Sequence, residues 1–282
     1  MNRHIWIVTG GGLLLLFTLF FLGRTTKPTA TTTAVTNAPA KGHDHPDTES
    51  ILAEARKSLT PSQSAFLATL EGTVHRGDVV SQRINAYEAL AAFWRDSARA
   101  LLPFLWYTGE KAKLEKSEKN LNFAAHALLE EVRGQPDPGR KAWMAEQAQA
   151  LFNESLALNP SNDSAIVGLG STYFFHAGPG GAPMEGILKI REVAARDSTN
   201  MFAQFMLGYG GLVSGQFDKA AERFEKVVAA EPWNKEAIFL LAESFERSGN
   251  RDKAAYWYGI ARTKVDNPEA VKAIDEKIKS LQ

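Results

Sequence analysis

The chain has 282 residues, with 32 basic and 32 acidic side chains, 44% hydrophobic residues and no cysteine. The balanced charge provides no basic field for nucleic acid, which excludes a nucleic-acid-binding function. The lack of cysteine excludes disulfides and thiolate catalysis, and the length is ample for a buried core or a solenoid.

The N-terminal segment is strongly apolar. Residues Ile5–Gly23 form a run of 19 without a charge, and twelve of them are Leu, Ile, Val or Phe. A helix of this length spans about 28 Å, close to the thickness of the hydrocarbon core. The nearest small-x-small cleavage site, Ala38-Pro39-Ala40, is distant and contains proline. We therefore interpret residues 1–24 as an uncleaved transmembrane anchor rather than a signal peptide.

The charges that flank this run decide little about its orientation. Arg3 lies before the run, and Arg24 and Lys27 follow it, so the positive-inside rule is nearly balanced. A very short tail before a span usually stays inside. We therefore expect a single-pass protein of the inner (cell) membrane whose C-terminal domain is periplasmic.

Residues 25–48 are rich in Thr, Ala and Pro and hold almost no large apolar side chain. Such a stretch cannot bury enough surface to order itself, so we interpret it as a flexible linker. As a random coil it would reach on the order of 25–30 Å. His43 and His45 with Asp44 and Asp47 offer metal-ligand types, but nothing fixes their geometry, and we expect no metal site.

Two blocks of the sequence, 201–234 and 235–268, align at a spacing of 34 residues. The equivalent pairs are Leu207 and Leu241, Gly208 and Ala242, Ala220 and Ala254, and Phe224 and Tyr258, whereas Pro232 and Pro268 are 36 apart. This pattern resembles the tetratricopeptide repeat, a helix–turn–helix unit. The resemblance implies an all-α fold, an α-solenoid of such units, with a protein-binding function and neither catalysis nor a cofactor.

The residues that match between the two blocks predict how the helices pack. The small residues Gly208 and Ala242 let the two helices of a unit approach closely, and Phe224 and Tyr258 are expected to fill the gap toward the next repeat. The turn between helices predicts glycine C-caps, helix N-caps and terminating prolines: Gly215, Gly249, Asp218, Asp252, Pro232 and Pro268.

Looser copies of the pattern extend upstream. Leu169 and Gly170 match the first helix of a unit over 163–200. The predicted TPR solenoid covers 49–282, and its parts are capping helices 49–78, repeats at about 84–117, 118–162, 163–200, 201–234 and 235–268, and a C-terminal capping helix 269–282.

The resemblance implies that the first helices line a concave groove. The residues that match its groove positions are Val167, Ser171, Phe174, Phe175, Phe202, Phe205, Tyr209, Leu212, Val213, Phe239 and Glu243, with Glu236 and Arg247 at the end. Such an apolar, aromatic groove suits an extended segment or an amphipathic helix of a partner. The alternative is that these side chains belong to the core or contact a capping helix.

Some members of the family clamp a terminal carboxylate with Lys and Asn on the first helices. The matching positions here hold Val, Ser, Phe, Tyr and Glu, so this type of recognition is not expected.

No catalytic constellation is found. The chain lacks a phosphate loop, a Gly-x-Ser-x-Gly elbow and a His-Glu-x-x-His motif, and His75, His126 and His176 are isolated. We predict a non-catalytic, membrane-anchored scaffold that binds an unknown protein partner, without a cofactor, metal, nucleic acid or small-molecule substrate. Two alternatives stay open: an envelope assembly or chaperone-like factor, for example of the cytochrome c biogenesis type, and a docking subunit of a signalling or enzymatic complex.

Overall fold

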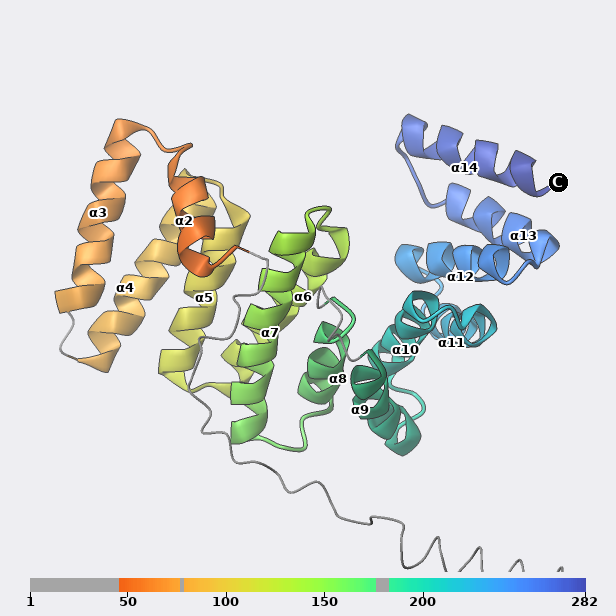
Figure 1. The fold of residues 1–282 in the computed structure, drawn as a ribbon, viewed down its shortest axis with the longest axis horizontal. Coiled ribbons are helices and arrows are strands. Elements are labelled where there is room, and N and C mark those ends of the chain that lie inside the picture. The colour runs from red at the N-terminus through yellow and green to blue at the C-terminus, as the bar shows by residue number, and fades with distance from the viewer. Residues whose placement is uncertain (1–45, 77–78, 176–182) are drawn as a thin grey trace, which may run out of the picture. The chain divides into compact units, whose positions relative to one another are not determined.

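The structure is a computed structural model, and it describes residues 46–76, 79–175 and 183–282. These residues form thirteen α-helices and one π-helical segment, and no strand, so the all-α class is confirmed for them (Figure 1). The helices are α2 (Thr48–Arg56), α3 (Pro61–Arg76), α4 (Val80–Ala92), η1 (Phe93–Ser97), α5 (Leu101–Glu115), α6 (Glu118–Gly134), α7 (Pro138–Leu158), α8 (Asp163–Thr172), α9 (Pro183–Arg196), α10 (Met201–Val213), α11 (Phe217–Ala230), α12 (Lys235–Arg247), α13 (Arg251–Arg262) and α14 (Pro268–Leu281).

The predicted membrane span and most of the predicted linker lie outside the described residues. No helix within the described residues is both long enough and apolar enough to cross a lipid bilayer.

The helices pack as consecutive pairs. Each of α6, α8, α10 and α12 contacts the helix that follows it, and these four first helices also contact one another in the order of the chain. A single cluster of buried side chains runs through the pairs, from Ile51 on α2 to Ile274 on α14. A second, smaller cluster holds α2 to α5 together around Trp94, which is fully buried. Because each pair buries its apolar face on the next, the array has no separate central core.

Asparagine caps the first helix in three consecutive pairs. The side chains of Asn162, Asn200 and Asn234 each accept a hydrogen bond of 2.9 Å from the backbone N–H three residues later. These bonds satisfy one of the donors that every helix start leaves unpaired. The shared cap sets where α8, α10 and α12 begin, and therefore which of their residues face the neighbouring pairs.

The N-caps of the second helices lie two residues before the predicted positions. Gly215 and Gly249 adopt left-handed backbone angles, with φ of 73° and 83°, as expected at helix C-termini. The chain then enters the next helix at once, so the N-cap positions fall on Gln216 and Asn250. Asp218 and Asp252 lie in the first helical turn instead, where a carboxylate favours the positive end of the helix.

The expected role of one proline is also wrong. Pro232 follows directly after Glu231, the C-cap of α11, and is compatible with the end of that helix. Helix α13, however, ends at Arg262, well before Pro268. Pro268 is the first residue of α14, because a helix start has no use for the N–H that proline lacks.

The small and aromatic residues that match between the two repeats pack against each other within one pair. A Cβ added to Gly208 would lie 2.8 Å from the ring of Phe224, which is fully buried. Phe224 therefore packs on the first helix of its own pair, with its ring 5.6 Å from that of Phe205. Tyr258 likewise donates a 2.7 Å hydrogen bond to Glu246 on α12. Both aromatics therefore hold the two helices of their own pair together, and their expected role toward the next repeat stays a prediction.

Candidate protein-binding surface

The residues predicted to line a groove fall into three classes of exposure. Two are half-buried aromatics, Phe202 and Tyr209, and Glu243 is also half-buried. Phe239 and Val213 are exposed, at 42% and 49%. The other six are buried: Val167, Ser171, Phe174, Phe175, Phe205 and Leu212. Only the first two classes offer surface to a partner in this structure.

The buried members have partners inside the chain. Ser171 donates a 2.7 Å hydrogen bond to the carbonyl of Val167, so its hydroxyl is satisfied within α8. The rings of Phe174 and Phe175 lie 6.3 and 5.5 Å from the ring of Tyr209. These side chains support the ring of Tyr209 from below, because aromatic pairs at this separation are mutually stabilising.

Arg133 lies at the centre of the remaining surface. Its guanidinium is 5.5 Å from the centre of the Phe205 ring, within the range of a cation–π contact. The same group donates hydrogen bonds of 3.1 Å to both carboxylate oxygens of Glu236 on α12, and it contacts Glu130 at 2.7 Å. Its side chain is only 12% exposed. Arg133 therefore joins α6 to α12, which are 103 residues apart in the sequence.

His126 continues this surface along α6. Its ring lies 5.3 Å from the ring of Phe202 and 5.0 Å from that of Phe152, and its Nε2 is 2.7 Å from the hydroxyl of Ser164. Burial lowers the pKa of His126 below its ordinary value, while Glu130 acts weakly in the other direction. The ring is therefore neutral at physiological pH and fixes the edge of Phe202 by packing rather than by charge.

Tyr209 has an electrostatically mixed environment. Burial raises its pKa above the ordinary value of 10.0; Arg133 opposes that change, and Glu236 and Glu243 support it. The phenol thus stays protonated and can both donate and accept a hydrogen bond. Together with Glu243, which pairs with Arg247 at 2.7 Å, it provides polar groups beside the aromatic rings.

We call the set Phe202, Tyr209, Phe239, Arg133 and Glu236 the aromatic surface. It combines exposed or half-buried rings from α10 and α12 with one cation and one carboxylate, and the Phe239 ring rests edge-on against Tyr258 at 5.6 Å. Such a surface can bury apolar side chains and orient them by a few polar contacts. In the described part of the chain, no group of three His, Asp or Glu side chains is placed to hold a metal ion.

Two members of this region were missed from the sequence, Arg133 and His126. A usable signal existed, since residues 126, 130 and 133 follow a spacing of four and three and so share one face of a helix. The ion pair of Arg133 with Glu236 could not be derived from that spacing, because it depends on how α6 and α12 are placed by the pairs between them.

Comparison with known proteins supports the repeat at one end of the chain. Residues 212–273 match the tetratricopeptide repeat family. No curated protein sequence matches the chain at a significant level.

Several solved structures are similar at low identity. A crystal structure of the MamA protein is 17% identical, covering 64% of this chain and 91% of that one, with a TM-score of 0.44. A MamA fragment from Desulfovibrio magneticus RS-1 is 18% identical, covering 67% and 96%, with a TM-score of 0.44. YrrB, described as a TPR protein with an unusual peptide-binding site, is 15% identical, covering 73% and 97%, with a TM-score of 0.44. These similarities identify no function for this chain.

Proposed function

We propose that this protein is a non-catalytic, membrane-anchored scaffold that binds a segment of a partner protein on the aromatic surface. The observation that carries the proposal is that Arg133 pairs with Glu236 and lies over Phe205, which stands between Phe202 and Tyr209 along α10, while Phe239 follows Glu236 by about one turn of α12. Aromatic side chains with an adjacent arginine are the residues most enriched among the energetic centres of protein interfaces. The family resemblance of the repeats, with residues 212–273 as its firmest part, favours the same class of function.

The chemistry of the surface favours a segment with apolar anchors. Phe202 is held on one side by His126, and Tyr209 by Phe174 and Phe175, so both rings are fixed before a partner arrives. Fixed rings lose little freedom on binding, which leaves more of the contact energy for affinity. Glu236 and Glu243 lie beside them and can accept hydrogen bonds from the partner's backbone or from a basic side chain.

The predicted anchor would hold the helical array close to the membrane. A span over residues 5–23 and a linker of about 25 residues would confine the helical array to a shell on the order of 25–30 Å from the membrane. Confinement raises the effective concentration of the aromatic surface toward other membrane-bound proteins. We propose that the array lies on the periplasmic side of the inner membrane.

Site-specific photo-crosslinking in cells tests the binding surface. A photoreactive phenylalanine analogue in place of Phe202 should form a discrete adduct with a partner, and Phe239→Ser in the same chain should reduce that adduct at least about fivefold, because it removes a neighbouring apolar contact of about 1 kcal/mol or more. Phe205 is left unchanged in this test, since it is buried against Phe224 and Arg133 and its substitution would disturb folding.

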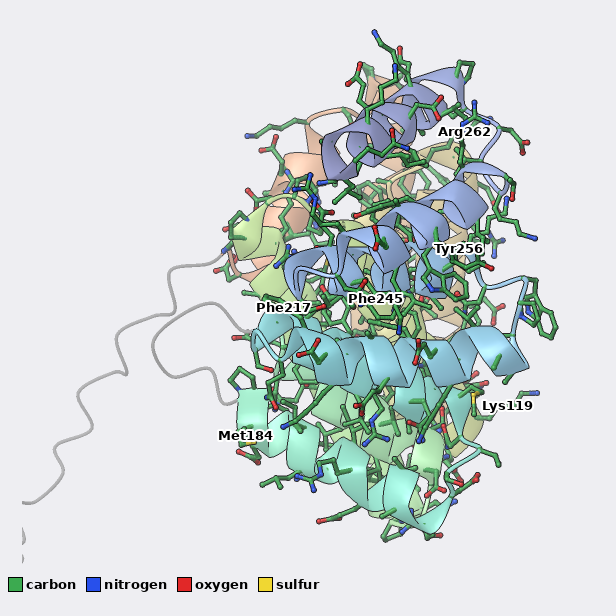
Figure 2. The ribbon with its side chains drawn as sticks, turned by 90° about the vertical axis from the view of Figure 1, so that its right-hand side faces the viewer. Lys119, Met184, Phe217, Phe245, Tyr256 and Arg262 are labelled. Carbon is green, nitrogen blue, oxygen red and sulfur yellow. The ribbon has the colours of Figure 1, made fainter. Side chains whose placement is uncertain are left out.

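Tyr256→Ser is the matched control. Tyr256 is an aromatic residue outside the aromatic surface. It lies on α13, is 64% exposed and is labelled in Figure 2. This variant should leave the adduct at position 202 unchanged. Equal loss in both variants, or an unchanged adduct in Phe239→Ser, would rule out the aromatic surface as the binding site.

Membrane topology is tested separately. An alkaline phosphatase fused after Gln282 is active only when exported, so we expect activity there and none when residues 1–24 are deleted. A fusion that is active only with a cytoplasmic reporter would reverse the proposed orientation.

A further inference from the structure

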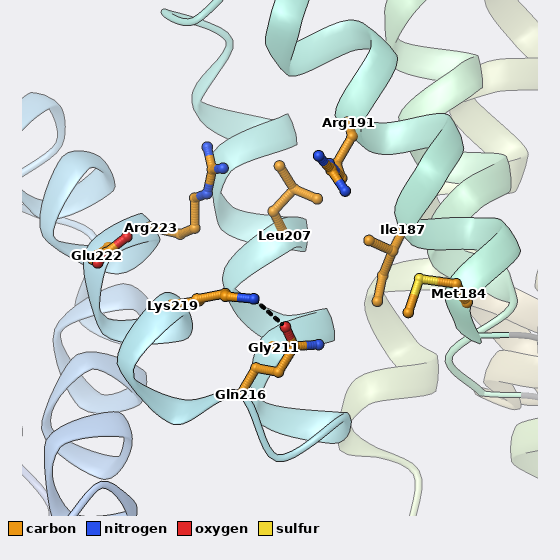
Figure 3. A pocket seen from close by; sticks show the side chains of 9 residues that line it. All are labelled: Met184, Ile187, Arg191, Leu207, Gly211, Gln216, Lys219, Glu222 and Arg223. Carbon is orange, nitrogen blue, oxygen red and sulfur yellow. Dashed lines mark hydrogen bonds between the residues drawn. The ribbon is translucent and has the colours of Figure 1, made fainter. Parts of the chain in front are cut away.

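A pocket lies on the opposite side of α10 from the aromatic surface. It has a volume of about 440 Å³ and is formed by α9, α10 and α11. Its apolar wall consists of Met184, Ile187 and Leu207 (Figure 3). Leu207 is two positions from both Phe205 and Tyr209, and a step of two residues turns a helix by about 200°, so α10 presents one face to each region.

Three cationic side chains surround this apolar wall. Arg191 comes from α9, while Lys219 and Arg223 come from α11, and Figure 3 shows them on both sides of Leu207. Within the described residues none of the three forms an ion pair with a carboxylate. Arginines elsewhere in the array do so, for example Arg262 with Asp275 and Arg247 with Glu243. The only acidic residue among those that line the pocket in the described chain is Glu222.

Neutral partners hold two of these cations in place. Arg223 donates a 2.8 Å hydrogen bond to the side-chain oxygen of Gln204, which is almost fully buried and is itself fixed by a 3.0 Å bond to the carbonyl of Ser198. Lys219 donates a 2.8 Å bond to Gln216. Because an amide positions a cation without neutralising it, the pocket keeps its positive charge. Like charges gathered in this way are relieved by an anion.

We propose that this pocket is a second binding site and that it takes an acidic peptide segment, in which an apolar side chain is flanked by carboxylates. The apolar wall would receive the side chain, and the cations on the two sides would pair with the flanking carboxylates. Its volume is in the usual range for ligand pockets, roughly 300–1,000 Å³. The described lining contains no aromatic ring on which a nucleotide base could stack, and an apolar hollow between three helices suits an inserted peptide side chain better than a flat lipid surface.

Fluorescence anisotropy with the full-length chain in detergent tests this site. The probe is a fluorescein-labelled peptide of the sequence Glu-Glu-Leu-Asp-Glu-Leu, and its amide counterpart, Gln-Gln-Leu-Asn-Gln-Leu, is the matched peptide. The acidic peptide should bind and the amide peptide should not. Arg191→Glu combined with Lys219→Glu should weaken binding about tenfold, because two attractive charges become repulsive.

Lys226→Glu provides the control for net charge. Lys226 is exposed on α11 and does not line the pocket, so its reversal should leave the affinity within about twofold. Phe239→Ser should also leave this affinity unchanged, which separates the pocket from the aromatic surface. Equal weakening by Lys226→Glu, or equal binding of the two peptides, would overturn the proposal. Binding confined to a phosphorylated peptide or to vesicles of anionic phospholipid would also overturn it.

Discussion

At the scale of single residues, side chains of α6 and α10 shape the aromatic surface. Phe205 belongs to the core, where it contacts Phe224, and it forms the floor under the guanidinium of Arg133. His126, which looked isolated in the sequence, packs against Phe202 and Phe152. The usable surface is thus smaller than predicted and is organised by two side chains of α6.

His126 makes stability depend on pH in a defined direction. Burial holds its pKa in the folded chain below the value of 6.5 that is usual for an exposed histidine. The unfolded chain therefore takes up the proton first on acidification. The contribution of His126 to stability is complete above about pH 6.5 and is lost as the pH falls toward its folded-state pKa.

Urea unfolding at pH 7.5 and pH 5.5 measures this effect. We expect the wild-type chain to lose more free energy of unfolding between the two values than His126→Gln does, because the variant lacks the titrating ring. Parallel losses in the two proteins would show that the ring of His126 does not control this pH dependence.

At the scale of helix pairs, glycine positions set how closely two helices approach. The ring of Phe224 occupies the space next to Gly208, and on the preceding pair Gly170 and Gly186 bring the backbones of α8 and α9 together so closely that any side chain at Gly186 would overlap the carbonyl of Gly170. The caps Asn200 and Asn234 then set the start of each first helix. Small residues therefore set how closely the helices of a pair approach, and the caps set where its first helix begins.

Gly208→Ala tests this packing. The new methyl group would lie 2.8 Å from the Phe224 ring, so we expect a loss of about 1–3 kcal/mol in the free energy of unfolding. Gly259→Ala is the control, since Gly259 lies inside α13 and has open space around it. There the removal of a flexible glycine should stabilise the protein by about 0.5–1 kcal/mol. Effects of the same sign in chemical denaturation would contradict the proposed close contact.

At the scale of the whole molecule, Arg133 and Glu236 connect helices that the repeat order keeps apart. Adjacent pairs contact each other throughout the array, but this ion pair links α6 directly to α12. Its geometry places the guanidinium over Phe205 and beside Tyr209, so the same contact that links the two helices also shapes the aromatic surface.

A double-mutant cycle measures this connection. With Arg133→Met and Glu236→Gln, which keep the side-chain volumes, we expect a coupling energy of about 0.5–1 kcal/mol, because Arg133 is largely shielded from water. The pair Lys272–Glu276 on α14 is exposed on both sides and should give a coupling near zero. Equal coupling in the two cycles would mean that the α6–α12 contact adds nothing to stability.

The sequence by itself determined most of the local structure, apart from the N-caps of the second helices and the role of Pro268. The 34-residue spacing, the glycines at 215 and 249 and the small residues at 208 and 242 depend on contacts within one helix pair, and such contacts repeat wherever the pattern does. The all-α class of the described residues followed from this repeated pattern.

The tertiary structure decided which matched positions remain at the surface. Val167 and Phe205 share the pattern of groove residues yet are buried. The contacts that bury Phe205, that bring Arg133 to Glu236 and that gather three cations around Leu207 each join side chains from different helices. Their positions depend on the summed rotations of the helices between them, which no local spacing encodes.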